Sequence, residues 1–320
     1  MSEALPRFQV LTPSSVAEAV TALYAHPDAL PHAGGTDLIV RLRKGLSETG
    51  TLVDLGGIAV LQGIDPDAGG LRIGAGVTLA TLERAEALAA YPAIPKAVAV
   101  VAGPTHREVA TLGGNLCLDT RCVYYNQSHW WRQSNGFCLK YKGDTCHVAP
   151  QGNRCRAAFS GDIAPALMVH GAKIEIAGPE GTRHLPLTDF YHEDGAAHTD
   201  LRPGEIVVAV HLPPPGPQSD YAKIRVRGAI DYPLAGIAVA CTASSEGKRF
   251  TLAVTGTNSM PVLVKSPGVL GAADDSDAYF AALEKLVQKT VSPQRTGTLA
   301  PHYRRLSVSA LAARLARRLA

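Results

Sequence analysis

The sequence lacks several features that would assign it to common functional classes. Its net charge is only +3 over 320 residues, which is too small to indicate a nucleic-acid-binding protein. No apolar run reaches the roughly 18 residues of a membrane-spanning helix. Residues 1–7 show no basic start followed by an apolar block, so no secretory signal is expected and the predicted location is the cytoplasm. Aromatic residues make up only 6%, whereas hydrophobic residues reach 46% and supply a core for two or three domains.

Cysteine is also scarce, but it is unevenly distributed. Five of the six cysteines lie between Cys117 and Cys155, and only Cys241 stands apart, in an apolar run. In a reducing compartment, clustered cysteines are more often metal ligands or redox groups than disulfides. Cys241 is expected to be a buried structural thiol.

The chain is predicted to have three parts of mixed α and β character. Residues 1–60 form a small unit with a capping box, Ser15-x-x-Glu18, at the start of a helix. Residues 61–216 end in a strand and a proline-rich linker at 213–217. Residues 217–320 add three strands and a final helix with a basic polar face, which either docks on its own domain or contacts a partner subunit.

Two glycine turns are candidates for a cofactor site. Ala33-Gly34-Gly35-Thr36-Asp37 lets backbone N–H groups approach phosphate oxygens closely, although a plain tight turn has the same pattern. Thr111-Leu112-Gly113-Gly114-Asn115 is a second such turn, and the two loops together would hold an extended nucleotide. Gly74-x-Gly76 lacks the third glycine of a dinucleotide fingerprint, so a Rossmann site is not expected.

The segment 120–157 differs in composition from the remainder of the chain. It holds both tryptophans, six basic residues and one acidic residue, and it has no sustained helical or strand period. So long a loop inside a compact domain is either disordered or stapled by something other than a hydrophobic core.

Four cysteines of this region form a candidate metal-ligand set. Four thiolates suit either a [4Fe–4S] cluster or a structural zinc, and the long, uneven spacings favour the cluster. Trp130, Trp131 and Phe137 would exclude water from the bound metal group. Cys117 is expected to be a packed thiol; alternatively, it takes the place of Cys122 as a ligand. The four are Cys122, Cys138, Cys146 and Cys155.

The order of these motifs resembles one family over nearly the whole chain. The two glycine loops followed by Asp162 look like the FAD-binding subunits of the molybdenum hydroxylases, the family of xanthine dehydrogenase and carbon monoxide dehydrogenase. Gly204-Glu205-Ile206-Val207, Tyr221-Ala222-Lys223 and His302-Tyr303-Arg304-Arg305 are similar to later segments of that family. The resemblance implies an α+β fold. A two-subdomain FAD-binding domain of the vanillyl-alcohol-oxidase (PCMH-like) type, residues 1–60 and 61–216, would carry the insertion 120–157. A C-terminal α/β domain of the CO-dehydrogenase flavoprotein type, residues 217–320, would follow.

When the family's FAD contacts are placed on the matching residues of this sequence, the resemblance implies an FAD site. Thr111, Gly114 and Asn115 would hold the phosphates and the flavin side. Val101 and Val207 stand at apolar contacts, Asp162 at an acidic contact, and Lys223 at the flavin edge. Glu108 stands where the family has Asn and receives no role, and Gly161 replaces a Pro. The loop that would wrap the pyrophosphate consists of Pro31, His32, Ala33, Gly34, Gly35, Thr36, Asp37 and Leu38.

The insertion resembles the extra segment of the 4-hydroxybenzoyl-CoA reductase branch, which carries a [4Fe–4S] cluster. This resemblance implies an electron-transfer subunit in a hetero-oligomer with a molybdenum-cofactor subunit and a [2Fe–2S] subunit. Reduced ferredoxin would be the electron donor, and the basic insertion, with Lys140 and Lys142, would dock it. The reaction would be reductive dehydroxylation to benzoyl-CoA, with substrate bound on a partner because no catalytic dyad or nucleophile is visible here.

Two other functions stay open from the sequence. One is an FAD subunit of an oxidative molybdenum hydroxylase, with a structural zinc in the insertion. The other is a non-catalytic FAD-binding or assembly module whose cysteines only staple a loop.

Overall fold

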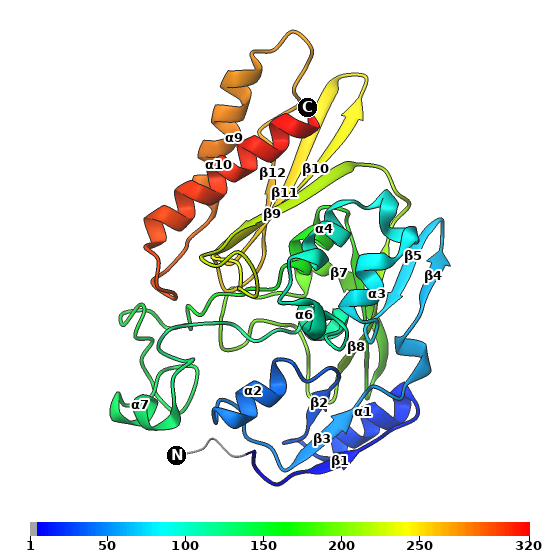
Figure 1. Cartoon of the computed structure of the whole chain (residues 1–320), viewed down its shortest axis with the longest axis vertical. Helices are drawn as coiled ribbons and strands as arrows, with labels where there is room; N and C mark the ends of the chain where they lie inside the picture. The colour runs from blue at the N-terminus through cyan, green and yellow to red at the C-terminus, as the bar shows by residue number, and fades with distance from the viewer. Residues whose placement is uncertain (1–4) are drawn as a thin grey trace.

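The computed structural model describes residues 5–320, which form three β-sheets with helices packed against them (Figure 1). The first sheet is parallel, in the order β1-β3-β2, and carries two helices. Ser15 caps the first helix by accepting from the Glu18 N–H, whereas the Glu18 carboxylate turns to Ser14, so the predicted capping box is half formed. The elements are β1 (Gln9–Leu11), α1 (Val16–Ala25), β2 (Leu30–His32), α2 (Leu38–Arg43) and β3 (Thr51–Asp54).

The second sheet is antiparallel, with the order β4-β5-β8-β6-β7. One hydrophobic core lies between this sheet and the helices of the same region. A second, smaller core joins the sheet to the first unit, where Val20 and Leu23 of α1 pack with Ile206 and Val208. Residues 79–90 form a short α-helix followed by a 3₁₀ turn. The strands are β4 (Ile64–Asp67), β5 (Gly70–Gly74), β6 (Lys173–Gly178), β7 (Gly181–Pro186) and β8 (Ile206–Leu212). The helices are α3 (Leu79–Arg84), α4 (Ala93–Ala99), α5 (Pro104–Arg107), α6 (Leu112–Leu116) and α8 (Ile163–Met168).

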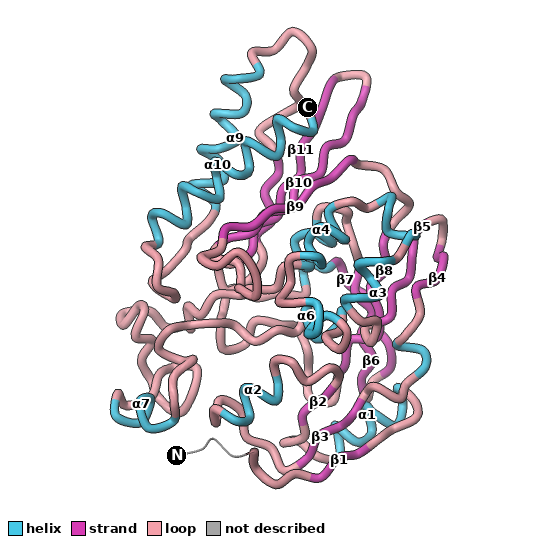
Figure 2. The backbone as a smooth tube through the Cα atoms, in the orientation of Figure 1, coloured by secondary structure: helices cyan, strands magenta, loops and turns pink. Residues whose placement is uncertain are grey.

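The third sheet, in the order β12-β11-β10-β9, is also antiparallel and has two long helices on one face (Figures 1 and 2). The final helix buries Leu311 and Leu315. Two of its basic residues pair within the chain, Arg317 with Asp277 and Arg318 with Asp220, so the helix docks on its own domain. The elements are β9 (Gln218–Ile224), β10 (Ala235–Ser244), β11 (Gly247–Thr255), β12 (Val262–Lys265), α9 (Ser276–Thr290) and α10 (Pro301–Leu319).

The segment 120–157 contains one short helix, α7 (His129–Ser134), and is otherwise loop, as its composition predicts (Figure 2). It has a small core of its own around Tyr125. Trp130 is 69% exposed, so the expectation that it shields the cysteines from water is wrong. A search of residues 5–320 for a helix long and apolar enough to cross a membrane finds none.

Candidate cofactor-binding sites

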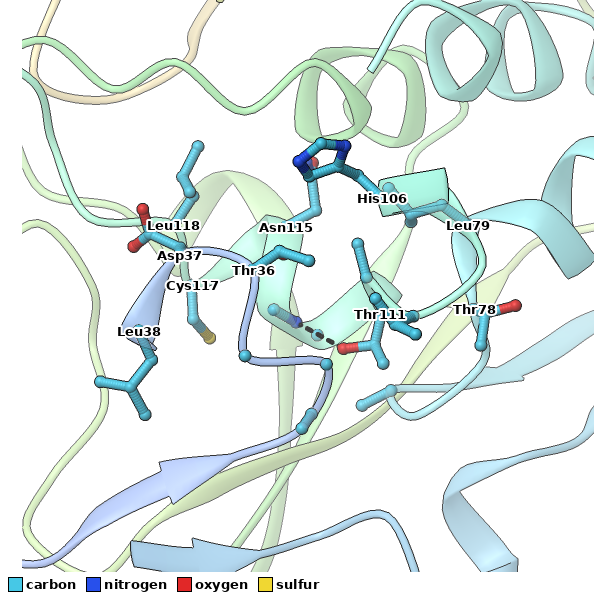
Figure 3. A pocket seen from close by; sticks show the side chains of 18 of the residues that line it. Thr36, Asp37, Leu38, Thr78, Leu79, His106, Thr111, Asn115, Cys117 and Leu118 are labelled. Carbon is cyan, nitrogen blue, oxygen red and sulfur yellow. Dashed lines mark hydrogen bonds between the residues drawn. The ribbon is translucent and has the colours of Figure 1, made fainter. Parts of the chain in front are cut away.

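A cavity of about 840 Å³ lies where the first sheet meets the second (Figure 3). The loop after β2 forms one wall, and the segment from Val101 to Asn115 forms another. A volume of this size suits a large ligand, since pockets for drug-sized molecules span roughly 300–1,000 Å³. The structure therefore brings together the two glycine loops that the sequence singles out.

The first glycine loop, residues 31–38, lines the cavity along its whole length. A Cβ atom on Gly34 would overlap the backbone carbonyl of Val109, so the two walls approach each other through this glycine. Gly35 has a φ of 68°, in the left-handed region that disfavours other residues. The Asp37 carboxylate, at the end of this loop, is paired with Arg121 of the insertion.

The second glycine loop begins helix α6. The Thr111 hydroxyl oxygen accepts from the Gly114 N–H at 3.2 Å, which leaves the hydroxyl proton free to donate. Asn115 accepts from the Ile163 N–H at 3.3 Å, and this bond fixes its amide at the cavity edge. Thr111, Gly114 and Asn115 all line the cavity, as do Val101 and Val207.

Asp162 lines the cavity as expected, whereas Lys223 does not reach its surface. The Lys223 ammonium is buried and lies 3.1 Å from the Asp162 carboxylate, which also accepts from the Tyr221 hydroxyl at 2.6 Å. Burial raises the pKa of Asp162 and lowers that of Lys223, and their mutual contact opposes both shifts. Lys223 therefore lies behind Asp162 and is linked to the cavity through that carboxylate.

Several lining residues were not predicted from the sequence. Ile230 and Tyr232 reach the cavity from the loop after β9, more than 110 positions beyond the second glycine loop. No local pattern marks them, because only the fold brings that loop to the cavity. Cys117 lines this cavity, and burial raises its thiol pKa to about 12. Cys117 is thus a packed thiol, and it does not line the space on which Cys122, Cys138, Cys146 and Cys155 converge.

Those four cysteines converge on a second, much smaller cavity inside the insertion. Cys122, Cys138, Cys146 and Cys155 all line it, together with Tyr124 and Tyr125. Three of the four are buried, and Cys138 is half-buried. His147 also borders this space, but its Nε2 bonds the Phe137 carbonyl, as a capping histidine would.

The backbone around Cys138 is bent tightly enough to aim its thiol at this cavity. Phe137 and Lys142 both adopt positive φ, at 57° and 58°, which costs a non-glycine residue of order 1 kcal/mol each. The Cys138 carbonyl accepts from the N–H groups of both Tyr141 and Gly143. Such strain persists where the surroundings enforce it, and it gathers at functional sites.

The sulfur atoms are spaced more widely than a zinc site requires. Within residues 5–320, no three cysteine sulfurs lie within 4.8 Å of one another. Four thiolates bound to zinc at about 2.3 Å stand roughly 4 Å apart. The four-thiolate set has the ligand chemistry of either an iron–sulfur cluster or a structural zinc ion. Burial raises the pKa of Cys155 to about 11 and also raises that of Cys122, with the neighbouring thiols adding to both shifts.

The basic residues of the insertion are mostly paired within the chain. Lys140 is only 6% exposed and lies 2.6 Å from Asp119, so the expectation that it belongs to an exposed docking face is wrong. Lys142 is exposed but pairs with Glu48. Among the six basic residues, Lys140 alone borders the cysteine cavity, where its positive charge lowers the pKa of Cys155 against the effect of burial.

The two cavities are joined by a very short stretch of chain. Leu118 lines the large cavity and Cys122 lines the small one. Four residues span at most about 14 Å. Asp119, between them, is held by both Arg41 and Lys140. This link keeps one wall residue of the large cavity within that distance of one of the four cysteines.

The fold and the large cavity define a protein that binds an extended nucleotide cofactor between two subdomains. The chain belongs to the FAD-binding subunits of the molybdenum hydroxylase family, since the family described as "FAD binding domain in molybdopterin dehydrogenase" matches residues 6–215. It is therefore an FAD-binding oxidoreductase subunit, and the α+β fold expected from the resemblance is confirmed.

Two curated relatives extend this similarity beyond the matched domain. The aldehyde oxidoreductase FAD-binding subunit PaoB of Escherichia coli is 32% identical over 288 residues, 86% of this chain and 90% of that protein. The carbon monoxide dehydrogenase medium chain of Afipia carboxidovorans is 31% identical over 305 residues, 93% and 91% of the two chains. In structure, reconstituted CO dehydrogenase from Oligotropha carboxidovorans matches with a TM-score of 0.77 and 26% identity, covering 99% of this chain and 98% of that chain.

Proposed function

We propose that this chain is the electron-relay subunit of an oxidative molybdenum-containing dehydrogenase. A molybdenum-cofactor subunit and a [2Fe–2S] subunit would be its partners. The family description names a molybdopterin dehydrogenase, and the curated relatives are named as FAD-binding subunits or medium chains of dehydrogenases and oxidoreductases. When bound, FAD exchanges one or two electrons and an iron–sulfur cluster exchanges one. The protein would hold both groups at fixed places and keep water from them.

The large cavity is the proposed FAD site. The residue set carried over for it is Pro31 to Leu38, Val101, Thr111, Gly114, Asn115, Asp162, Val207 and, through Asp162, Lys223. The glycine loop would supply backbone donors to the pyrophosphate, and Thr111 a hydroxyl donor. Asp162 would hold a polar group of the flavin side in a fixed position, because Tyr221 and Lys223 fix its carboxylate.

The small cavity is the proposed site of a [4Fe–4S] cluster with Cys122, Cys138, Cys146 and Cys155 as ligands. The convergence of these four residues on one space beside the FAD cavity is the observation that carries the relay function. Four thiolates would also suit the structural zinc of the oxidative alternative, so metal and sulfide content separate the two. Lys140 would place a positive charge against the thiolates, which raises a cluster's reduction potential.

Single cysteine substitutions test the ligand assignment. Cys138→Ser is expected to lose iron and acid-labile sulfide while keeping FAD, whereas the matched controls Cys117→Ser and Cys241→Ser keep all three. Iron retained in Cys138→Ser, or lost in Cys117→Ser, would overturn the ligand set. Flavin that stays oxidised when substrate is added to the assembled complex would favour an assembly module over a relay subunit.

A second candidate is the reductive 4-hydroxybenzoyl-CoA reductase function with ferredoxin as donor. The cysteine-rich insertion favours it, whereas the names of the curated relatives favour the oxidative direction. The two are separated by mixing the assembled complex with an aldehyde or with 4-hydroxybenzoyl-CoA. Flavin reduction by the aldehyde supports the oxidative function. Benzoyl-CoA formation driven by reduced ferredoxin supports the reductive one.

A further inference from the structure

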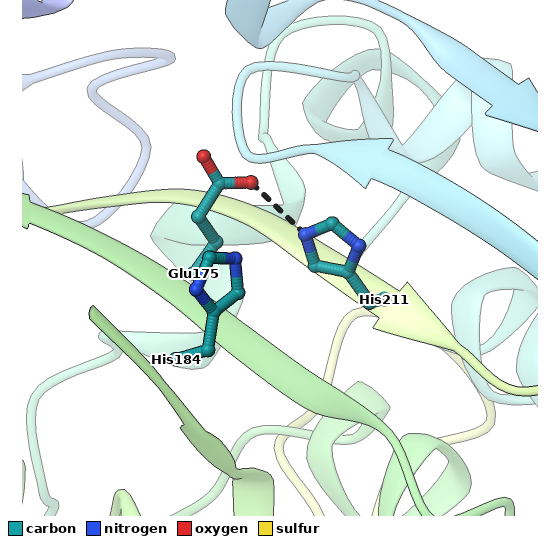
Figure 4. A group of neighbouring side chains, drawn as sticks. All are labelled: Glu175, His184 and His211. Atoms are coloured by element: carbon teal, nitrogen blue, oxygen red, sulfur yellow. Dashed lines mark hydrogen bonds and ion pairs between the residues drawn. The ribbon is translucent and has the colours of Figure 1, made fainter. Parts of the chain in front are cut away.

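A cluster of two histidines and a glutamate lies on the five-stranded sheet, outside both cofactor sites (Figure 4). Glu175, His184 and His211 bring one ligand atom each within 4.8 Å of one another. Among residues 5–320, they form the one group of His, Cys, Asp or Glu side chains with three ligand atoms so close.

Strand register, and not a mobile loop, holds the three side chains together. Glu175 on β6 pairs directly with His184 on β7. On its other side Glu175 faces Ala209 of β8, and His211 lies two residues further along that strand. Directly opposed and diagonal neighbours on one sheet face are within reach of long side chains. The site is therefore preformed on three adjacent strands.

The hydrogen bonds around His211 match the surroundings of a metal-bound histidine. Its Nε2 lies 2.9 Å from Glu175, and its Nδ1 lies 2.7 Å from the Asp67 carboxylate. A ligating histidine almost always gives its second ring N–H to a carboxylate or carbonyl, which fixes the ring and its tautomer. Arg72 donates to Glu175 at 3.3 Å, and a carboxylate has enough lone pairs to accept this bond and bind an ion as well.

We propose that Glu175, His184 and His211 bind a divalent transition-metal ion such as Zn²⁺, with Asp67 orienting His211. Two imidazoles and a carboxylate are a common zinc ligand set, with a fourth position for water. The ion would replace the proton between His211 Nε2 and Glu175. His184 is exposed, so the ion enters from solvent.

The bound ion would fasten the edge strand β7 to β8 across β6. This role is independent of the FAD and cysteine sites, so a failure here leaves the proposed function unaffected. It predicts that Zn²⁺ raises the thermal stability of the wild-type chain more than that of a variant lacking His184.

The test is titration of the full chain, carrying its cofactors and stripped of loosely bound metal, with Zn²⁺ in a calorimeter. His184→Ala is expected to weaken this binding at least tenfold, and Asp67→Asn about 10–100-fold. His302→Ala, an equally exposed histidine elsewhere, is the matched control and should bind as the wild type does. The proposal is overturned if His184→Ala titrates like His302→Ala, or if Cys138→Ser alone removes all zinc binding.

Discussion

The Lys140 ammonium lies 2.6 Å from the carboxylate of Asp119, which belongs to the short segment between the two cavities. Lys140 also approaches the Thr120 carbonyl at 3.1 Å and lies 4.5 Å above the Tyr125 ring. Burial raises the pKa of Asp119, but Lys140 and Arg41 outweigh it and hold this pKa below the usual carboxyl value. One buried cation thus ties the insertion to the FAD-binding domain.

Lys140→Met is expected to lower the free energy of unfolding by about 2–4 kcal/mol near neutral pH, because it leaves Asp119 buried with Arg41 alone. A depressed carboxyl pKa stabilises the fold above the unfolded pKa, and this contribution is lost as pH falls through the folded value. The difference from wild type should therefore shrink in acid. Urea unfolding at neutral and acidic pH measures it. The exposed Lys142→Met serves as control and should change stability by less than about 1 kcal/mol.

Gly34→Ala is expected to weaken FAD binding at least tenfold, because its Cβ would overlap the Val109 backbone and push the two cavity walls apart. Flavin content after gel filtration measures the effect. Gly297→Ala is the control, since nothing lies near the added methyl group there. Full flavin content in Gly34→Ala would contradict the assignment of this loop to the cofactor.

Asp162→Asn tests whether the buried Asp162–Lys223 pair serves the flavin or only the fold. It should reduce bound FAD or shift the flavin reduction potential, because it removes the charge that fixes the cavity edge. Asp220→Asn removes a similarly buried carboxylate, paired with Lys96 away from the cavity, and should lower stability while flavin content and potential stay unchanged. Identical flavin properties in both variants would mean that Asp162 acts on folding alone.

Because two histidines are buried, we expect the free energy of unfolding to fall in mild acid. Burial lowers the pKa of His170 and of His198 to about 4. From about pH 6.5 down to 4 the unfolded chain takes up protons that the folded chain does not, so the free energy of unfolding falls, by about 2–3 kcal/mol per histidine at pH 4. Urea midpoints across this range should decline less steeply in His170→Gln than in wild type. Exposed His302→Gln should follow the wild-type curve, and a flat wild-type curve would refute the prediction.

Much of this architecture could be predicted from the sequence because local patterns specify it. The strand near the end of residues 61–216 and the final helix were expected from the sequence, and the structure confirms them as β8 and α10. The glycine loops were identifiable because their function depends on backbone conformation, which glycine marks directly.

Features that depend on register or on distant contacts could not be predicted. Glu175, His184 and His211 have no common motif, because their proximity comes from pairing among three strands. The burial of Lys140 was missed for the same reason, since its partner Asp119 lies 21 positions away and a basic loop looks solvent-exposed from composition alone.

The proposed relay depends on an iron–sulfur cluster held beside FAD in this subunit. The most direct test is the content of iron, acid-labile sulfide, zinc and FAD in a single anaerobic preparation of the wild-type protein. We expect four iron, four sulfide and one FAD per chain, as a [4Fe–4S] cluster beside FAD requires. One zinc with FAD and no sulfide would contradict it and leave the cysteines as a structural zinc site in an FAD subunit.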